Sequence, residues 1–153
     1  MKKFKFTLET VHNVREMKQE SELLVFTQLQ NEAAAAAEQV EKIEELYLRA
    51  IENYGNKLGT GRVMNIGEVE LEAMHISALD RQKRRAIEIL EEKKQACVLQ
   101  SAKLGAAARE VKITDRLRET QVLRHRLETD KHEQTALDEM VSANFARQLT
   151  TKI

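Results

Sequence analysis

The sequence predicts an all-α fold, a long antiparallel two-helix coiled-coil hairpin whose second helix is longer than its first. The 153 residues include no proline, and four of the five glycines lie between Gly55 and Gly67. Both residue types disfavour helix interiors, so the long stretches on either side of this window are expected to be helices. A third of the residues are charged and only 4% are aromatic. This balance is typical of coiled coils, which bury a narrow seam, rather than of compact globules.

The first helix is expected over about residues 5–54. Apolar side chains recur there at intervals of eleven residues, and a run of alanines spans residues 33–37. Because eleven residues are close to three helical turns, the repeat predicts a nearly straight helix. The alanine run predicts a smooth patch where another backbone comes close. The two apolar series are Val14, Val25, Ala36, Tyr47 and Leu58, and Leu29, Val40 and Ile51.

A turn is expected over about residues 55–67, where glycine supplies the positive φ values that a helix end and a chain reversal need. The closely spaced Gly59 and Gly61 also suggest comparison with a phosphate-binding loop. That hypothesis fails because the stretch lacks a third glycine at the required spacing, a Gly-Lys-Ser/Thr sequence and a preceding strand. The sequence therefore favours a turn.

The second helix is expected over about residues 68–148, and a heptad repeat marks its inward face. One line of the repeat is apolar except at Lys83, and the companion line is small and partly polar. Spacing of seven residues predicts coiled-coil packing, so residues 1–153 are expected to form one coiled-coil domain. Beyond Val111 only a looser apolar pattern continues. The first line is Val69, Ile76, Lys83, Leu90, Cys97, Leu104 and Val111. The companion line holds Leu79, Ala86 and Ala107 with Glu72, Lys93 and Gln100. The looser pattern is Leu123, Leu127, Leu137, Val141 and Phe145.

The formal net charge of zero conceals a split between the two predicted helices. Residues 9–52 carry ten acidic and four basic side chains, whereas residues 81–131 carry fourteen basic and eight acidic ones. Attraction between the opposite charges favours the pairing of the two helices. The neutral total, and the absence of aromatic residues interleaved with the basic ones, argue against a nucleic-acid partner.

The helices are unequal, so one end of the second helix is expected to lack a partner. Antiparallel pairing about Gly61 places Leu8 near residues 112–114, and everything after about Arg116 then extends past the N-terminus. A lone amphipathic helix cannot bury its own apolar stripe, so residues 117–149 are the best candidate for a partner-binding segment. The apolar side chains expected to be exposed at this end are Phe4, Phe6, Leu137, Val141 and Phe145.

The residues that usually carry chemistry form no recognisable constellation. His12, His75, His125 and His132 lack the close spacing of a metal site on a helix, and Cys97 lies on the heptad seam. We therefore expect no enzyme activity, no cofactor and no small-molecule substrate. The N-terminus lacks the apolar run of a signal peptide, and the longest aliphatic run, residues 23–26, is far too short to span a membrane. A cytoplasmic location is the simplest expectation.

Two short phrases lie near the termini. Residues 4–15 read Phe-x-Phe-x-Leu-x-x-Val-x-x-x-Arg, and residues 133–139 read Glu-x-x-x-Leu-Asp-Glu. Together with the length, the two-helix layout and the lack of proline, they resemble the FliJ family, the small cytoplasmic stalk proteins of the flagellar type III export apparatus. The resemblance implies an antiparallel coiled coil similar to the central stalk of rotary ATP synthases.

The resemblance also implies partners and binding residues. Such a protein binds the hexameric export ATPase, promotes assembly and activity of its ring, and links it to export chaperones and to the cytoplasmic domain of the export gate membrane protein. It would be peripherally associated with the inner-membrane export apparatus. The residues that match the family's ATPase-facing phrases are Phe4, Phe6, Leu8, Val11, Arg15, Leu137, Asp138 and Glu139, and the residues in the gate-facing region are Gln39, Ile43, Tyr47 and Tyr54.

Two other interpretations remain open from the sequence. The equivalent stalk protein of an injectisome would have a similar shape. An unrelated cytoplasmic coiled-coil adaptor or holdase would explain the hairpin but not the terminal phrases.

Overall fold

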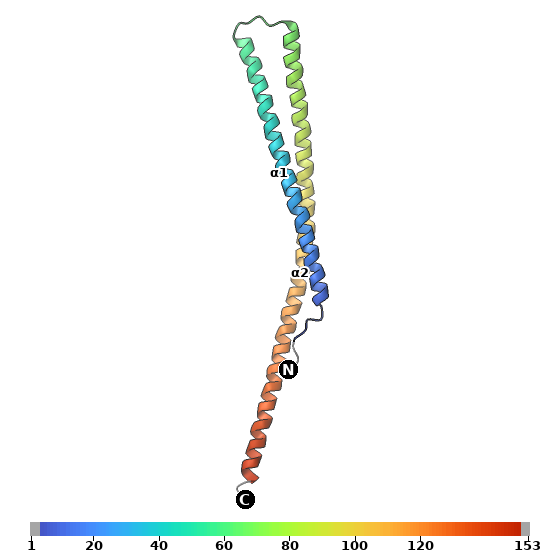
Figure 1. Ribbon diagram of the computed structural model, residues 1–153, viewed down its shortest axis with the longest axis vertical. Coiled ribbons are helices and arrows are strands. Elements are labelled where there is room, and N and C mark those ends of the chain that lie inside the picture. Colours follow the sequence, from blue (N-terminus) through green and yellow to red (C-terminus); the bar gives the residue numbers. More distant parts are fainter. Residues whose placement is uncertain (1–3, 151–153) are drawn as a thin grey trace. The chain divides into compact units, whose positions relative to one another are not determined.

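The computed structural model describes residues 4–150, which contain two long helices packed against each other and no strand. Helix α1 comprises Glu9–Gly59 and helix α2 comprises Ile66–Thr150 (Figure 1). Residues near the end of one helix pair with residues near the start of the other, so the helices are antiparallel. The predicted all-α hairpin with a longer second helix is confirmed.

The described chain divides into two compact units, and both helices contribute to each. Unit 1 consists of residues 4–19 and 107–150, and unit 2 consists of residues 20–106. Unit 2 therefore contains the loop between the helices, and unit 1 contains the N-terminal segment and the C-terminal part of α2.

The loop in unit 2 is shorter than the glycine window predicts. Helix α1 passes through Gly55 and ends at Gly59, and Val63 lies in the loop that follows. Of the glycines only Gly61 has a positive φ, of 65°, because a single left-handed residue is enough to leave the helix here. Asn65 directly precedes α2, and its carbonyl oxygen accepts the amide hydrogen of Glu68 at 3.0 Å, which closes the first turn.

The seam of unit 2 follows the predicted heptad on α2. Leu79, Ala86 and Gln100 are buried there, and the other members of both predicted lines within this unit are half-buried. On α1, Val14, Val25 and Leu58 of the eleven-residue series are exposed. The inward face of α1 in unit 2 instead has heptad spacing, at Glu22, Phe26, Leu29, Ala33, Ala36, Val40, Ile43, Tyr47, Ala50 and Tyr54.

Ion pairs join α1 to α2 across unit 2. The Lys83 Nζ donates to a Glu44 carboxylate oxygen at 2.9 Å, and Lys57 pairs with Glu72 near the loop. The Lys93 Nζ donates to Glu32 at 2.6 Å. This hydrogen bond, aided by one from Gln28, holds the pKa of the Glu32 carboxyl below its ordinary value. Two of these three pairs join an acid of α1 to a base of α2, as the charge split predicts, whereas the pair of Lys57 with Glu72 has the reverse polarity.

Candidate interaction surface

The N-terminal segment before α1 packs along α2 within unit 1. We call residues 4–8 the N-terminal strap. The Phe6 side chain is only 4% exposed, lies edge-on to the His12 ring at 6.4 Å, and has the Arg118 guanidinium 6.0 Å from its centroid. Phe4 lies edge-on to the His125 ring at 5.7 Å. The expectation that Phe6 is exposed was wrong, because the strap turns this ring inward against α1 and α2.

A buried polar pair lies beneath the strap. His12 and Thr114 are 3% and 1% exposed, and the His12 Nδ1 lies 2.9 Å from the Thr114 hydroxyl oxygen. The Thr114 hydroxyl oxygen also lies 2.8 Å from the Val111 carbonyl oxygen of its own helix. The His12 Nε2 faces carboxylate oxygens of Glu16, at 3.1 Å, and Asp115, at 3.4 Å. The imidazole thereby links the two helices through both ring nitrogens.

Arg15, another residue of the N-terminal phrase, is also engaged inside unit 1. Its guanidinium donates to the Glu110 carbonyl oxygen at 3.0 Å, and Lys18 pairs with the Glu110 carboxylate at 3.8 Å. Leu8 is half-buried, and Val11 points to solvent. Much of the N-terminal phrase therefore holds the strap and α1 on α2.

The contacts of the N-terminal strap reach His125, nine residues beyond the expected point. Antiparallel pairing about Gly61 placed the end of the paired region near Arg116. The strap is not helical, so each residue advances farther along α2 than the 1.5 Å of a helical residue. It therefore reaches Gln121 and His125, which contact Thr7 and Phe4.

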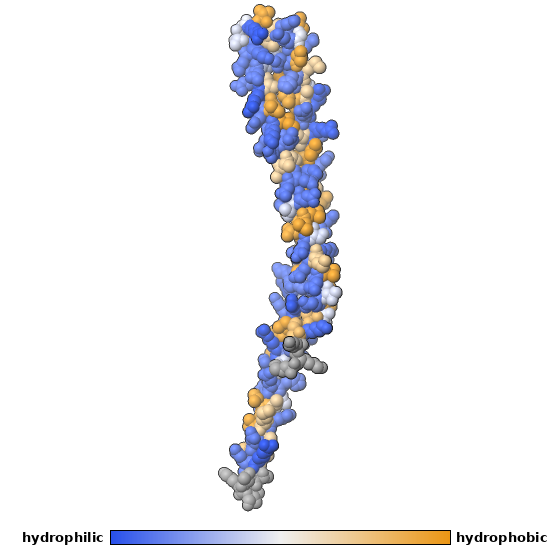
Figure 2. Space-filling view, in the orientation of Figure 1, coloured by the Kyte–Doolittle hydropathy of each residue, from blue (hydrophilic) through white to orange (hydrophobic). Residues whose placement is uncertain are grey.

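Beyond His125 almost every described side chain of α2 is exposed. Between residues 126 and 148 only Thr129 is half-buried. Figure 2 shows apolar surface among the charged side chains on this part of α2. Leu137, Asp138 and Glu139 of the C-terminal phrase all face solvent. The exposed large apolar side chains of this segment are Leu127, Leu137, Met140, Val141 and Phe145.

The four gate-facing candidates lie on α1 in unit 2 and have different environments. Gln39 is exposed. Ile43, Tyr47 and Tyr54 are half-buried on the inward heptad face, and the Lys83 ammonium lies 5.4 Å from the centroid of the Tyr47 ring. Three of the four side chains thus contribute to the seam, and Gln39 alone among them is freely available to a partner.

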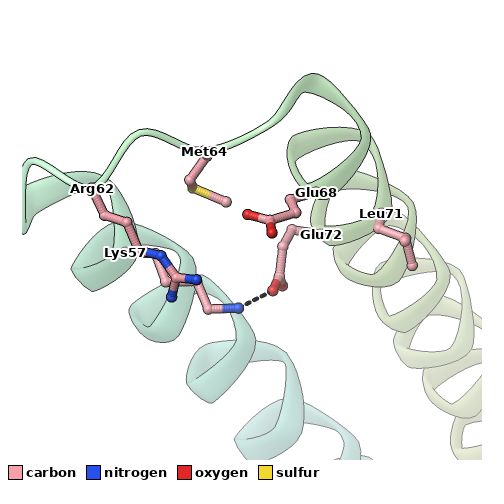
Figure 3. A pocket seen from close by; sticks show the side chains of 6 residues that line it. All are labelled: Lys57, Arg62, Met64, Glu68, Leu71 and Glu72. Atoms are coloured by element: carbon pink, nitrogen blue, oxygen red, sulfur yellow. Dashed lines mark hydrogen bonds and ion pairs between the residues drawn. The ribbon is translucent and has the colours of Figure 1, made fainter.

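A shallow hollow of about 320 Å³ lies beside the loop of unit 2 (Figure 3). It is lined by Lys57, Arg62, Met64, Glu68, Leu71 and Glu72. The ion pair between Lys57 and Glu72 crosses it, so opposite charges already neutralise one another there.

No group of three or more histidine, cysteine, aspartate or glutamate side chains within the described residues is arranged to hold a metal ion. Neither helix, over the part described, has a stretch long and apolar enough to cross a membrane.

The polar residues on the inward face of α1 were not predicted from the sequence. His12 and Gln19 lie seven residues apart on the inward face of α1, and so do Arg15 and Glu22. In unit 2 the Gln100 amide donates to the Glu22 backbone carbonyl at 3.1 Å and also bonds its carboxylate. Heptad spacing of these polar residues was the available signal, but a search for apolar periodicity passes over it.

Comparison with known proteins gives a match that covers nearly the whole chain. A family model described as the flagellar FliJ protein matches residues 4–150, a span that includes both helices and both terminal phrases. No curated protein and no solved structure matches the chain significantly. The family match favours the resemblance over an unrelated adaptor or holdase.

Proposed function

The chain belongs to the FliJ family of flagellar proteins, and on that premise we propose that it is a non-catalytic stalk component of the flagellar type III protein export machinery. In this role it binds the hexameric export ATPase and promotes assembly of the active ring. It also links the ring to the cytoplasmic domain of the export gate and to export chaperones. It acts in the cytoplasm at the inner-membrane export apparatus, by binding alone and without a cofactor.

The observation that carries the ATPase proposal is the exposed C-terminal part of α2. Leu137, Val141 and Phe145 lie on one side of this helix and are exposed, with Asp138 and Glu139 beside them. Exposed apolar clusters with a polar rim usually mark binding surfaces. We assign the direct contacts with the ATPase to this segment.

The N-terminal phrase supports the same surface in a different way. Phe6 and Arg15 are held by α2, so they fix the strap and α1 on α2 rather than reach for a partner. Phe4, Leu8 and Val11 remain partly or fully open to solvent and add to the contact surface. On this proposal the strap ends where the ATPase-binding part of α2 begins.

Ring activation follows from mass action. A protein that binds assembled ATPase better than free subunits shifts the equilibrium towards the assembled state, by an amount set by the difference between the two affinities. No catalytic group is needed for this effect. On α1 the exposed Gln39 is the best candidate for direct contact with the gate, whereas Ile43, Tyr47 and Tyr54 act through the seam that positions it.

The test is deletion of residues 132–153 in an assay of a purified cognate export ATPase. The strap residues Phe4 and Thr7 contact His125 and Gln121, which the deletion leaves in place, so we expect the truncated chain to keep its melting temperature. We expect stimulation of the ATPase to fall to the basal rate. Joint Asp138→Ala and Glu139→Ala changes should weaken stimulation by a smaller factor.

The matched control replaces an adjacent acidic pair elsewhere on α2, Glu91 and Glu92 of unit 2, with alanine. These residues are exposed like Asp138 and Glu139. We expect this control to stimulate the ATPase as well as the unchanged chain does. Full stimulation of the ATPase by the truncated chain would contradict the proposal that the C-terminal segment binds the ATPase.

A further inference from the structure

Helix α2 of unit 1 carries a second line of regularly spaced side chains on the side away from α1. Nine residues are two and a half helical turns, so a residue nine positions from a seam residue lies on the opposite side of the helix. Arg116 is nine residues after the buried Ala107, and Leu123 is nine residues after the buried Thr114. We call this line, with its neighbour Ile113, the basic–apolar stripe; its members are Arg109, Lys112, Ile113, Arg116, Leu123 and Leu127.

The three cations of the stripe lack acidic partners. Within the described residues no carboxylate forms an ion pair with Arg109, Lys112 or Arg116. They stand three and four residues apart, a spacing at which like charges destabilise a helix by about 0.2–0.5 kcal/mol per pair. By contrast, Lys18 and Arg118 of the same unit pair with acids across the helices. The stripe therefore has uncompensated positive charge that an acidic partner would neutralise.

Apolar side chains are interleaved with these cations. Ile113, Leu123 and Leu127 are 55%, 59% and 55% exposed. A shallow hollow of about 210 Å³ is formed around Ile113 by the three cations. The spacing of three, four and seven residues from Arg109 to Leu127 is that of one face of a coiled coil. Such a face accepts the side chains of a helix lying along it.

We propose that the basic–apolar stripe docks one amphipathic helix of a partner protein. The partner helix is acidic where it faces Arg109, Lys112 and Arg116, and it packs aliphatic side chains against Ile113, Leu123 and Leu127. The nineteen positions from Arg109 to Leu127 correspond to roughly 27 Å of α2, so the partner contributes about five helical turns. Charge complementarity selects an acidic helix over a basic one.

Nucleic acid and anionic membranes are poorer occupants of this stripe. Aromatic side chains, on which single-stranded bases stack, are absent from it. Heptad spacing of the aliphatic residues suits another helix better than a phosphate backbone or a lipid surface. The proposal concerns residues 109–127, so it does not rest on the assignment of residues 132–153 to the ATPase.

The test uses the full chain and a synthetic acidic peptide of about three heptads, with leucine at a and d and glutamate at e and g. Binding is measured by fluorescence anisotropy at low salt. Joint Arg109→Glu, Lys112→Glu and Arg116→Glu changes should weaken binding about tenfold or more, and so should joint Leu123→Ala and Leu127→Ala changes. A peptide with lysine in place of glutamate should bind the charge-reversed variant better than the unchanged chain.

The matched control reverses three basic residues in unit 2, Arg81, Arg84 and Arg85, and so changes the net charge by the same amount. We expect it to keep the peptide affinity of the unchanged chain, and circular dichroism should show the same helix content for all variants. Equal losses in the two charge-reversed variants would overturn the proposal, as would the absence of peptide binding at about 1 mM. Binding of an oligonucleotide or of anionic vesicles as tight as that of the peptide would also overturn it.

Discussion

At the scale of single residues, Phe6 fills the space between α1 and α2 in unit 1. Its ring packs on His12 and lies under the Arg118 guanidinium, which pairs with Glu9 at 3.9 Å. The Phe6 ring is thus surrounded by residues that are themselves paired across the helices. Removing it would open a cavity over the buried hydrogen bond between His12 and Thr114.

We expect Phe6→Ala to lower the free energy of unfolding by about 2–4 kcal/mol, through lost burial and the cavity left behind. Urea unfolding followed by circular dichroism measures this change. The control is Phe145→Ala, because Phe145 is 65% exposed; we expect its effect to stay within about 0.5 kcal/mol. Equal stability of the two variants would show that the strap adds nothing to unit 1.

His12 and its neighbours also explain why residue-level prediction was uneven. The inward line of α2 was predicted because Val69, Ile76 and Leu90 lie on one seven-residue repeat, which only Lys83 interrupts. On α1 the inward line near the N-terminus is polar, while Val14 and Val25 face water. Hydrophobic periodicity finds a seam only where the seam is apolar. Hydrogen bonds such as that of His12 depend on the partner helix, which local sequence does not specify.

At the scale of elements, the loop of residues 60–65 connects α1 to α2 in unit 2. The glycine-rich sequence predicted the position of this loop, but the residues where the loop begins and ends depend on which glycine ends α1. Gly55 and Gly59 stay helical, at a cost of roughly 1 kcal/mol each against alanine, because α1 is held on α2 by pairs such as Lys57 with Glu72. Packing between helices thus overrides the local preference of glycine.

Limited trypsin digestion should therefore cut the loop at Arg62 before it cuts α1 at Lys57. Arg62 is exposed outside both helices, whereas Lys57 is helical and ion-paired. Mass spectrometry of the first fragments from the paired region identifies the site, and Arg62→Gln should slow this cleavage about tenfold or more. First cleavage within the paired helices, at Lys93 or Lys94, would contradict the position of the loop.

At the scale of the whole molecule, α1 carries an excess of acidic side chains, and residues 81–131 of α2 carry an excess of basic ones that attracts it. Glu32 and Lys93 show this attraction most directly: the hydrogen bond between them lowers the pKa of the Glu32 carboxyl and raises the pKa of the Lys93 ammonium. A carboxyl with a lowered folded pKa stabilises the fold at pH values above its ordinary value near 4.5. That contribution is lost as the pH falls through the lowered pKa.

Acidification should accordingly lower the melting temperature below about pH 5, because protonation of the carboxylates leaves both helices positively charged and removes the ion pairs between them. We expect Lys93→Met to lower the melting temperature at pH 7 and to reduce the difference between pH 7 and pH 3. The matched control is Lys42→Met, which removes an ion pair with Glu38 inside α1, where no second helix is joined. Its effect at pH 7 should be smaller. Equal effects of the two variants, or a melting temperature that rises on acidification, would show that attraction between the helices does not stabilise the hairpin.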